Sequence, residues 1–253
     1  MITLHLIGIG TGNPDHLTRA AVRVLNAADL ILLPRKGPDK TDLADLRRTI
    51  LAEVLTAPVP VAAFDMPRRD PDTEYRAAVN DWHDAIAEVW ADTIAHHLPQ
   101  GGHVALMVWG DPSLYDSSLR IAERLGAGGR TLTVRVLPGI TSLQALTAAH
   151  AIPLNTLAAP VTITTGRLLR AEGWPQGAIS VAVMLDAGMA YEVLDPSGLY
   201  IWWGAYLGLA QETLIAGTLA TTAARITAER ARLRAQHGWI MDIYLLRRTM
   251  PDD

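Results

Sequence analysis

The N-terminal segment limits the fold of this chain more than any other part. Residues 2–7 form a short run typical of a β-strand, and the run ends at the glycine-rich segment 8–14. Glycines permit the positive φ angles of a tight strand-to-helix turn. A helix over residues 15–28 and a second buried strand over residues 29–34 follow. A strand, a helix and a strand in this order predict a parallel sheet.

Two more strands of the first half run directly into loops. A strand over residues 103–109 continues into the loop Gly110-Asp-Pro-Ser-Leu-Tyr115, and a strand over residues 131–137 continues into Pro138-Gly-Ile-Thr-Ser142. Open parallel sheets bind ligands at the carboxyl ends of their strands, so both loops are candidate ligand sites.

The remaining segments complete the expected order of elements. Residues 35–71 predict surface loops around one helix, and Asp72 is a candidate cap for a long helix that reaches Pro99. The segment 152–160 is flanked by prolines and lacks a period, which indicates a linker. We therefore expect two α/β domains, 1–155 and 156–253. A helix over 142–150 closes the first half, and in the second half the pattern predicts strands over 161–165, 179–185, 199–203 and 239–246, and helices over 210–216 and 222–236.

Composition excludes several classes of protein. The 253 residues include no cysteine, which removes disulfides, thiolate metal sites and cysteine nucleophiles. The formal net charge of −4 argues against a general nucleic-acid binder. Apolar runs are too short for a membrane span, and the N-terminus lacks the pattern of a signal peptide. We expect a cytoplasmic, globular protein without a membrane partner.

The first glycine loop departs from the dinucleotide-binding pattern. That pattern needs a glycine where this chain has Asn13, and an acidic residue at the end of the next strand. The next strand ends in Leu32, Leu33 and Pro34, so binding of a nicotinamide dinucleotide is disfavoured. Two interpretations stay open, a tight turn with no further role and a ligand-facing loop of another kind.

Five motifs lie along essentially the whole chain: Gly8–Thr18, Gly110–Tyr115, Pro138–Ser142, Val183–Leu185 and Gly217–Leu219. Taken together, they resemble those of the tetrapyrrole (corrin/porphyrin) methyltransferase family. The resemblance implies two α/β domains that bind S-adenosylmethionine in a cleft between them, and a homodimer. Further motifs, among them Leu46-Arg47-Arg48, resemble the subgroup that methylates C-1 of the corrin precursor precorrin-5 and releases acetate.

The resemblance also implies which residues bind the cofactor. Asp111 is expected to position the ribose or the amino-acid part, because a strongly stabilising carboxylate beside the sulfonium would slow methyl transfer. Apolar walls from the second domain would hold adenosine. The implied cofactor residues are Thr11, Trp109, Gly110, Asp111, Leu114, Tyr115, Thr141, Ser142, Met184, Leu185, Gly204, Ala205 and Met241.

Acetate release requires an activated water, and the tetrapyrrole substrate carries several carboxylates. The candidates for the general base are Asp15, His16, Tyr115 and Asp116, which lie on the first two loops. Arg35 and Lys36 follow the second strand and are candidate substrate-binding cations. No metal is required. Two alternatives stay open: a family member that acts on another precorrin position, a protein or ribosomal RNA, and a non-catalytic cofactor-binding module.

Overall fold

The chain folds into two compact units. The computed structural model describes residues 1–35, 41–69, 74–129 and 131–248. The first unit comprises Met1–Thr141 and the second Ser142–Asp253. This division lies before helix α5 (Ser142–Ala149), not near residue 155, because α5 packs on strands β8 (Leu199–Ala205) and β10 (Asp242–Arg248) of the second unit.

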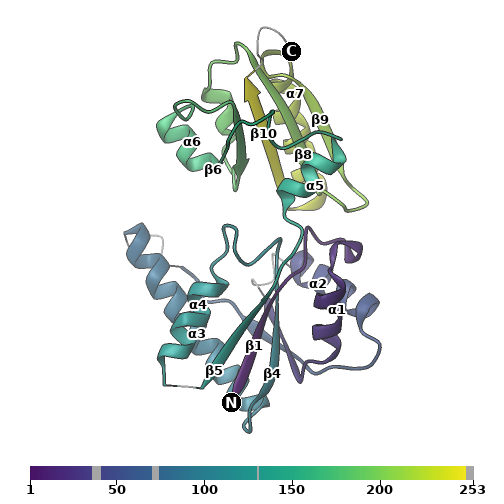
Figure 1. Cartoon of the computed structure of the whole chain (residues 1–253), viewed down its shortest axis with the longest axis vertical. Helices are drawn as coiled ribbons and strands as arrows, with labels where there is room; N and C mark the ends of the chain where they lie inside the picture. The colour runs from purple at the N-terminus through teal and green to yellow at the C-terminus, as the bar shows by residue number, and fades with distance from the viewer. Residues whose placement is uncertain (36–40, 70–73, 130, 249–253) are drawn as a thin grey trace. The chain divides into compact units, whose positions relative to one another are not determined.

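The first unit contains the predicted parallel sheet (Figure 1). Its strand order is β3-β2-β4-β1-β5, and every neighbouring pair is parallel. β3 lies within the segment for which the sequence predicts only surface loops and a helix. The strands are β1 (Ile2–Gly8), β2 (Leu30–Arg35), β3 (Val61–Asp65), β4 (Gly102–Val108) and β5 (Leu132–Leu137).

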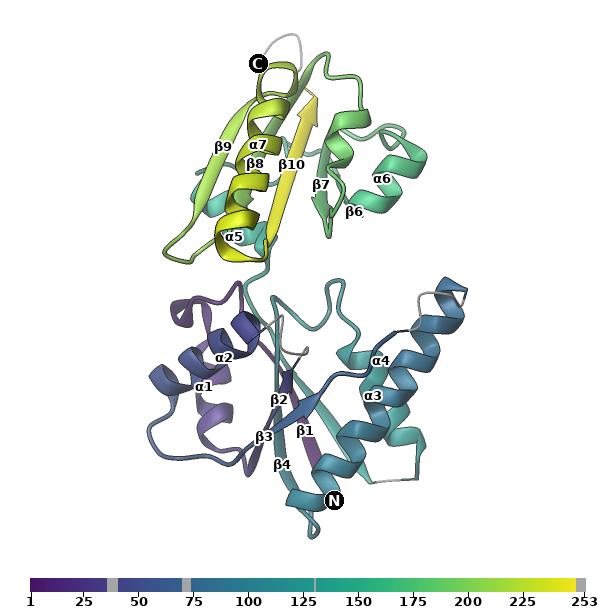
Figure 2. The ribbon, with the colours of Figure 1, turned by 180° about the vertical axis from the view of Figure 1, so that it is seen from behind.

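Helices cover both faces of this sheet (Figures 1 and 2). Leu4 and Leu6 of β1 pack with α3 and α4, whereas Ile7 packs with α1 and α2 on the opposite face. This alternation follows from the period of two along a strand, and it explains why apolar residues occupy both faces of the central strands. The helical elements are η1 (Pro14–His16), α1 (Arg19–Asn26), α2 (Thr41–Val54), α3 (Tyr75–His97) and α4 (Ser118–Ala127).

The long helix α3 is capped by a different residue from the one expected. Glu74 is its N-cap, and the Glu74 carboxylate accepts a hydrogen bond from the N–H of Ala77 at 2.9 Å. The predicted cap, Asp72, lies outside the described residues.

The second unit has a mixed five-stranded sheet with the order β6-β7-β10-β8-β9. β6 and β7 are parallel, β10 is antiparallel to both β7 and β8, and β8 is antiparallel to β9. Helices α5 and α7 lie on opposite faces (Figures 1 and 2). The remaining elements are β6 (Val161–Thr165), α6 (Gly166–Glu172), β7 (Ser180–Met184), η3 (Ala190–Val193), β9 (Thr213–Thr218) and α7 (Leu219–His237).

The predicted helix over residues 210–216 is wrong. The structure has strand β9 there, and its residue Ile215 is buried opposite Trp203 of β8. Pairing along β8 satisfies the backbone of this short segment, and so tertiary context overrides the helix propensity of its alanines. The segment 166–172, by contrast, forms α6, which was not expected.

Within the described part of the chain, no helix has the length and apolar character to span a lipid bilayer.

Candidate functional site

Three loops at the carboxyl ends of β1, β4 and β5 pack backbone against backbone. The N–H of Gly110 donates a hydrogen bond to the carbonyl of Gly10 at 2.7 Å. A Cβ atom added at Gly139 would lie 2.1 Å from the Gly110 carbonyl oxygen, and one added at Gly8 would lie 2.6 Å from the Gly139 nitrogen. Positions 8 and 139 therefore require glycine because the loops approach too closely for any side chain. We call this contact of the three loops the glycine junction.

Asp111 fastens the same junction through its side chain. Its Oδ2 accepts the N–H of Gly139 at 2.9 Å, and its Oδ1 accepts the N–H of Ser113 at 2.8 Å. Partial burial acts to raise the pKa of Asp111, but hydrogen bonds from the Ser113 hydroxyl and from these two N–H groups hold the pKa below its usual value. Asp111 thus stays ionised and joins the second loop to the third. A direct contact with the ribose or amino-acid part of a cofactor stays a prediction.

The first loop holds two of the predicted site residues in a local hydrogen-bond network. The Thr11 hydroxyl lies 3.0 Å from Nδ1 of His16. Asp15 is exposed in the first turn of η1, where its N–H donates to the side chain of the N-cap Asn13 at 2.9 Å. The loop therefore brings Thr11 and His16 together, and Asp15 serves the start of the short helix. Their predicted roles in binding and in water activation stay predictions.

Apolar side chains are exposed beside the glycine junction. Tyr115 is the last residue of the second loop, has a φ of 49° and is 43% exposed, and Ile140 of the third loop is 36% exposed. Leu114 is partly buried, and Thr141 is buried. Apolar side chains are thus available beside the junction, and a contact between them and a cofactor stays a prediction.

In the second unit, three of the implied cofactor residues lie at the ends of strands. Met184 ends β7 and Ala205 ends β8, while Met241 precedes β10. Since β10 is antiparallel to both strands, its start lies at the edge where β7 and β8 end; Asp242 pairs with Ala205 in this register. The structure thereby brings together three residues that the family resemblance implies for the cofactor.

Leu185, the next residue after β7, is exposed, and a buried carboxylate fixes the loop that it begins. Leu185 has a φ of 53° and is 67% exposed. Asp186 Oδ2 accepts the Tyr244 hydroxyl at 2.6 Å, and Asp186 Oδ1 accepts the N–H of Gly188 at 3.0 Å and faces Arg170 at 3.3 Å. These bonds fix the loop and leave Leu185 facing solvent. Sequence reasoning missed Asp186, because nothing in the local pattern distinguishes it from a turn residue.

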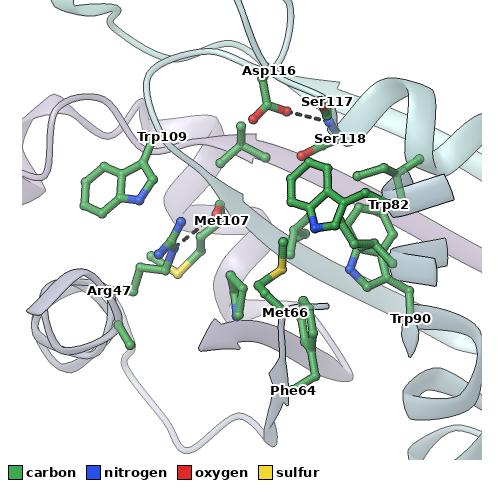
Figure 3. Close-up of a pocket in the computed structure, with 16 residues that line it drawn as sticks. Arg47, Phe64, Met66, Trp82, Trp90, Met107, Trp109, Asp116, Ser117 and Ser118 are labelled. Atoms are coloured by element: carbon green, nitrogen blue, oxygen red, sulfur yellow. Dashed lines mark hydrogen bonds between the residues drawn. The ribbon is translucent and has the colours of Figure 1, made fainter. Parts of the chain in front are cut away.

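Gly204, Ser142 and Trp109 complete the implied cofactor set. Gly204 is buried in β8, and Ser142 is the partly buried first residue of α5. Trp109 follows β4, and its side chain lines a cavity of the first unit (Figure 3). Contact of these three side chains with a cofactor stays a prediction.

That cavity has a volume of about 150 Å³ and contains a buried arginine that sequence reasoning did not assign. Arg47 of α2 is 8% exposed; its guanidinium lies 4.8 Å from the centre of the Trp109 ring, and its Nε donates to the Met107 carbonyl at 3.3 Å. Burial lowers the pKa of Arg47 to about 10, although the nearby Asp116 carboxylate acts to raise it. The only sequence signal was the motif Leu46-Arg47-Arg48.

Asp116, a predicted candidate base, lines the same cavity (Figure 3). Its Oδ1 accepts the N–H of Ser118 at 2.6 Å, which places the carboxylate at the start of α4. The structure therefore unites Asp116 with Arg47 and Trp109, residues that are distant in sequence.

One of the two predicted substrate-binding cations lies in the described part of the chain. Arg35 pairs with Asp65 at the end of the neighbouring β3, through an Nε–Oδ1 distance of 3.1 Å and an Nη2–Oδ2 distance of 3.1 Å. Because one cation faces one anion, the pair contributes no net positive charge. Lys36 lies outside the described residues. Binding of substrate by either residue stays a prediction.

Comparisons with known proteins agree on one family. The family model "Tetrapyrrole (Corrin/Porphyrin) Methylases" matches residues 3–223. Precorrin-6A synthase (deacetylating) from Sinorhizobium sp is 46% identical over 246 residues, which are 96% of this chain and 94% of that protein. The crystal structure of a protein described as related to cobalamin synthesis (CobF), from Corynebacterium diphtheriae, has a TM-score of 0.86 at 39% identity and covers 99% of this chain and 100% of that chain.

A more distant structure shares the fold. Uroporphyrin-III C-methyl transferase from Thermus thermophilus, complexed with S-adenyl homocysteine, has a TM-score of 0.61 at 19% identity over 97% of each chain. The two units, the loops at their strand ends and the match to the family model across residues 3–223 lead to one conclusion. This chain belongs to the tetrapyrrole (corrin/porphyrin) methylase family.

Proposed function

We propose that this protein is an S-adenosylmethionine-dependent C-methyltransferase that methylates precorrin-5 at C-1 and releases acetate, forming precorrin-6A. The observation that carries the proposal is the 46% identity with precorrin-6A synthase (deacetylating) over nearly the full length of both chains. The likeness to CobF over 99% of this chain supports the same assignment. The net charge of −4 weighs against the alternative of an RNA substrate.

The residues at the strand ends fit S-adenosylmethionine in chemical type. Met184 and Leu185 offer apolar surface for an adenine ring, and Leu185 is 67% exposed. The space beside Gly110 in the glycine junction is open, because a Cβ added there would contact only the Thr141 Cα, at 3.9 Å. A ligand can therefore come close to the backbone at this position. Ligand sites for such molecules combine apolar walls with a few fixed polar groups.

When bound, S-adenosylmethionine supplies the methyl group from a positively charged sulfonium. Asp111 does not need to meet that charge, because its carboxylate oxygens already accept hydrogen bonds from Gly139 and Ser113. Its contribution is to hold the second and third loops in fixed positions. Positioning of this kind lowers the barrier of an in-line displacement by removing motion that the reactants would otherwise lose.

Acetate release needs a base, and we propose Asp116 from among the four candidates. Its carboxylate lines a cavity, whereas Asp15 is exposed at the start of η1 and His16 is engaged with Thr11. Water would attack the acetyl carbonyl carbon, and the base would take a proton. The C–C bond to C-1 would then break and leave its electron pair on the macrocycle, where the methyl group adds.

One assay tests the proposed function directly. Purified protein is incubated with precorrin-5 and methyl-labelled S-adenosylmethionine, and both labelled product and acetate are measured. Equal amounts of incorporated methyl and released acetate are expected. Methylation without acetate would instead favour another position on a precorrin, and cofactor binding without any transfer would favour a non-catalytic module.

Met184→Arg is expected to weaken S-adenosylmethionine binding by at least tenfold. The change adds a positive charge to the proposed adenosine site of a cofactor that already carries a positive sulfonium, and it removes apolar surface at the end of β7. Isothermal titration calorimetry measures the affinity. Leu168→Arg is the control, because Leu168 is a partly exposed apolar residue of α6 in the same unit. Equal affinities for the two variants would count against Met184 as a cofactor residue.

We further propose that the protein acts in the cytoplasm as a homodimer. The absence of cysteine suits a reducing compartment but does not require one. Sedimentation velocity at several protein concentrations tests the assembly; a single species at the monomer mass of 27.3 kDa would contradict it.

A further inference from the structure

The cavity beside Trp109 contains hydrogen-bond donors that lack an acceptor. The Nε1 atoms of Trp109 and Trp90 are buried without a hydrogen-bond partner among the described residues, and both tryptophans line the cavity. A buried N–H that has lost its water and gained no acceptor costs free energy. These two indole N–H groups are therefore available to donate hydrogen bonds to a ligand.

At one end of the cavity, the indole N–H of Trp109 lies beside the positive charge of Arg47. Figure 3 shows the Trp109 indole nitrogen on the side of its ring that faces Arg47, while Trp90 lies at the other end. The guanidinium and the indole N–H of Trp109 are both donors. A ligand with acceptor oxygens at this end would meet Arg47 and Trp109 together.

The rest of the cavity limits the size and charge of that ligand. Phe64, Met66 and Trp82 give it apolar walls, and Asp116 places a negative charge at its border. The volume is about 150 Å³. An engineered cavity of roughly that volume in another protein binds benzene, so a ligand of a few heavy atoms fits. A dianion such as phosphate would be repelled by Asp116 more than a monoanion with an apolar tail.

We propose that this cavity binds a short carboxylate of two or three carbon atoms through the Arg47 guanidinium and the Trp109 indole N–H. Arginine pairs with carboxylates through parallel N–H donors, and the indole adds a third. Under the proposed function, on which the source of the ligand rests, two molecules carry this group. They are the acetate released from C-1 and a carboxylate arm of the tetrapyrrole.

Binding is tested on the full chain without tetrapyrrole or cofactor. Sodium acetate is added to ¹⁵N-labelled protein at constant pH and ionic strength, and the indole N–H signals are followed by NMR. We expect a saturable shift of the Trp109 signal, which Trp109→Phe identifies by its disappearance. Propionate is expected to cause the same shift, and inorganic phosphate is expected to cause none.

Variants separate the site from general effects of acetate. Arg47→Ala is expected to weaken acetate binding by roughly tenfold or more, and Arg47→Lys by less, because lysine keeps the charge but not the planar donors. Arg48→Ala is the control on the same helix, since Arg48 is half-exposed and pairs with Asp45. If Arg47→Ala does not fold, Trp109→Phe, which keeps an aromatic ring, is read by calorimetry and is expected to weaken acetate binding.

Two further outcomes decide the proposal and the source of the ligand. The absence of a saturable shift in the unaltered protein, or equal affinity in Arg47→Ala, Arg47→Lys and Trp109→Phe, would overturn it. If Arg47→Ala raises the KM for precorrin-5 and leaves kcat unchanged, the cavity takes an arm of the substrate, because the arm is charged before and during the reaction; if the variant lowers kcat and leaves KM unchanged, the cavity takes the released acetate, whose charge develops only in the reaction. Acetate binding without methyl transfer would refute the proposed function and leave this carboxylate site standing.

Discussion

Replacing Gly139 with alanine is expected to abolish S-adenosylmethionine binding and to lower the free energy of unfolding by about 3 kcal/mol. The new Cβ would lie 2.1 Å from the Gly110 carbonyl oxygen and 2.8 Å from the Gly8 Cα, both of which are backbone atoms. No side-chain rotation can relieve that overlap, so the third loop must move away from the other two. The movement also breaks the hydrogen bond from the Gly139 N–H to Asp111.

Gly126→Ala is the matched control for this experiment. Gly126 lies in α4 of the same unit, and a Cβ there would meet only the Leu132 side chain at an ordinary 3.7 Å. Alanine in a helix is slightly favourable, so its stability should equal or exceed that of the unaltered protein. Urea denaturation gives the free energies, and calorimetry gives cofactor affinity. Wild-type affinity in Gly139→Ala would show that the glycine junction does not shape the cofactor site.

Replacing Asp186 with alanine is expected to destabilise the second unit by about 3–5 kcal/mol. The substitution leaves the buried Tyr244 hydroxyl without its acceptor at 2.6 Å, and it removes the carboxylate partner of Arg170. Burial and the Asp186 carboxylate hold the pKa of Tyr244 above its usual value, so this hydroxyl stays a neutral donor. The loop that exposes Leu185 would lose its anchor, and cofactor affinity should fall with stability.

The control for Asp186 is a carboxylate with similar local bonding but no burial. Asp195 accepts the N–H of Ser197 at 3.0 Å in an exposed turn, so Asp195→Ala should change stability by only about 0.5 kcal/mol. A thermal melt of both variants compares the two sites. If the two variants melt at the same temperature, the network around Asp186 contributes nothing beyond a surface turn.

The parallel sheet of the first unit could be predicted because its determinants are local. Each central strand is a short, predominantly apolar run that ends at glycine or proline, and these runs alternate with segments of helical period. The loops at 110–115 and 138–142 could also be located, because they follow directly after such strands. That the three loops meet at Gly8, Gly110 and Gly139 depends on strand order, which no local pattern encodes.

Elements whose stability comes from distant partners escaped prediction. β9 is a strand because it pairs with β8, and its own alanine-rich neighbourhood favours a helix. Arg47 looks like a surface residue of an amphipathic helix, yet α2 packs so that its guanidinium is buried beside Trp109. Asp186 acquires its role only when Tyr244, 58 positions later, supplies a hydroxyl. A site that is assembled from separate segments can be identified only in the folded structure.

The position of β10 determines when the second unit can fold during translation. β10 lies between β7 and β8, although it is the last strand in the chain. The pair β6–β7 is therefore joined to the pair β8–β9 only through β10, after residues 242–248 have left the ribosome. The first unit, in contrast, has all of its strands once residue 137 has emerged. Domains fold as units during translation, N-terminal first. We therefore expect the second unit to fold after its synthesis is complete, with the exposed edges of β7 and β8 open to chaperones or to aggregation until β10 inserts.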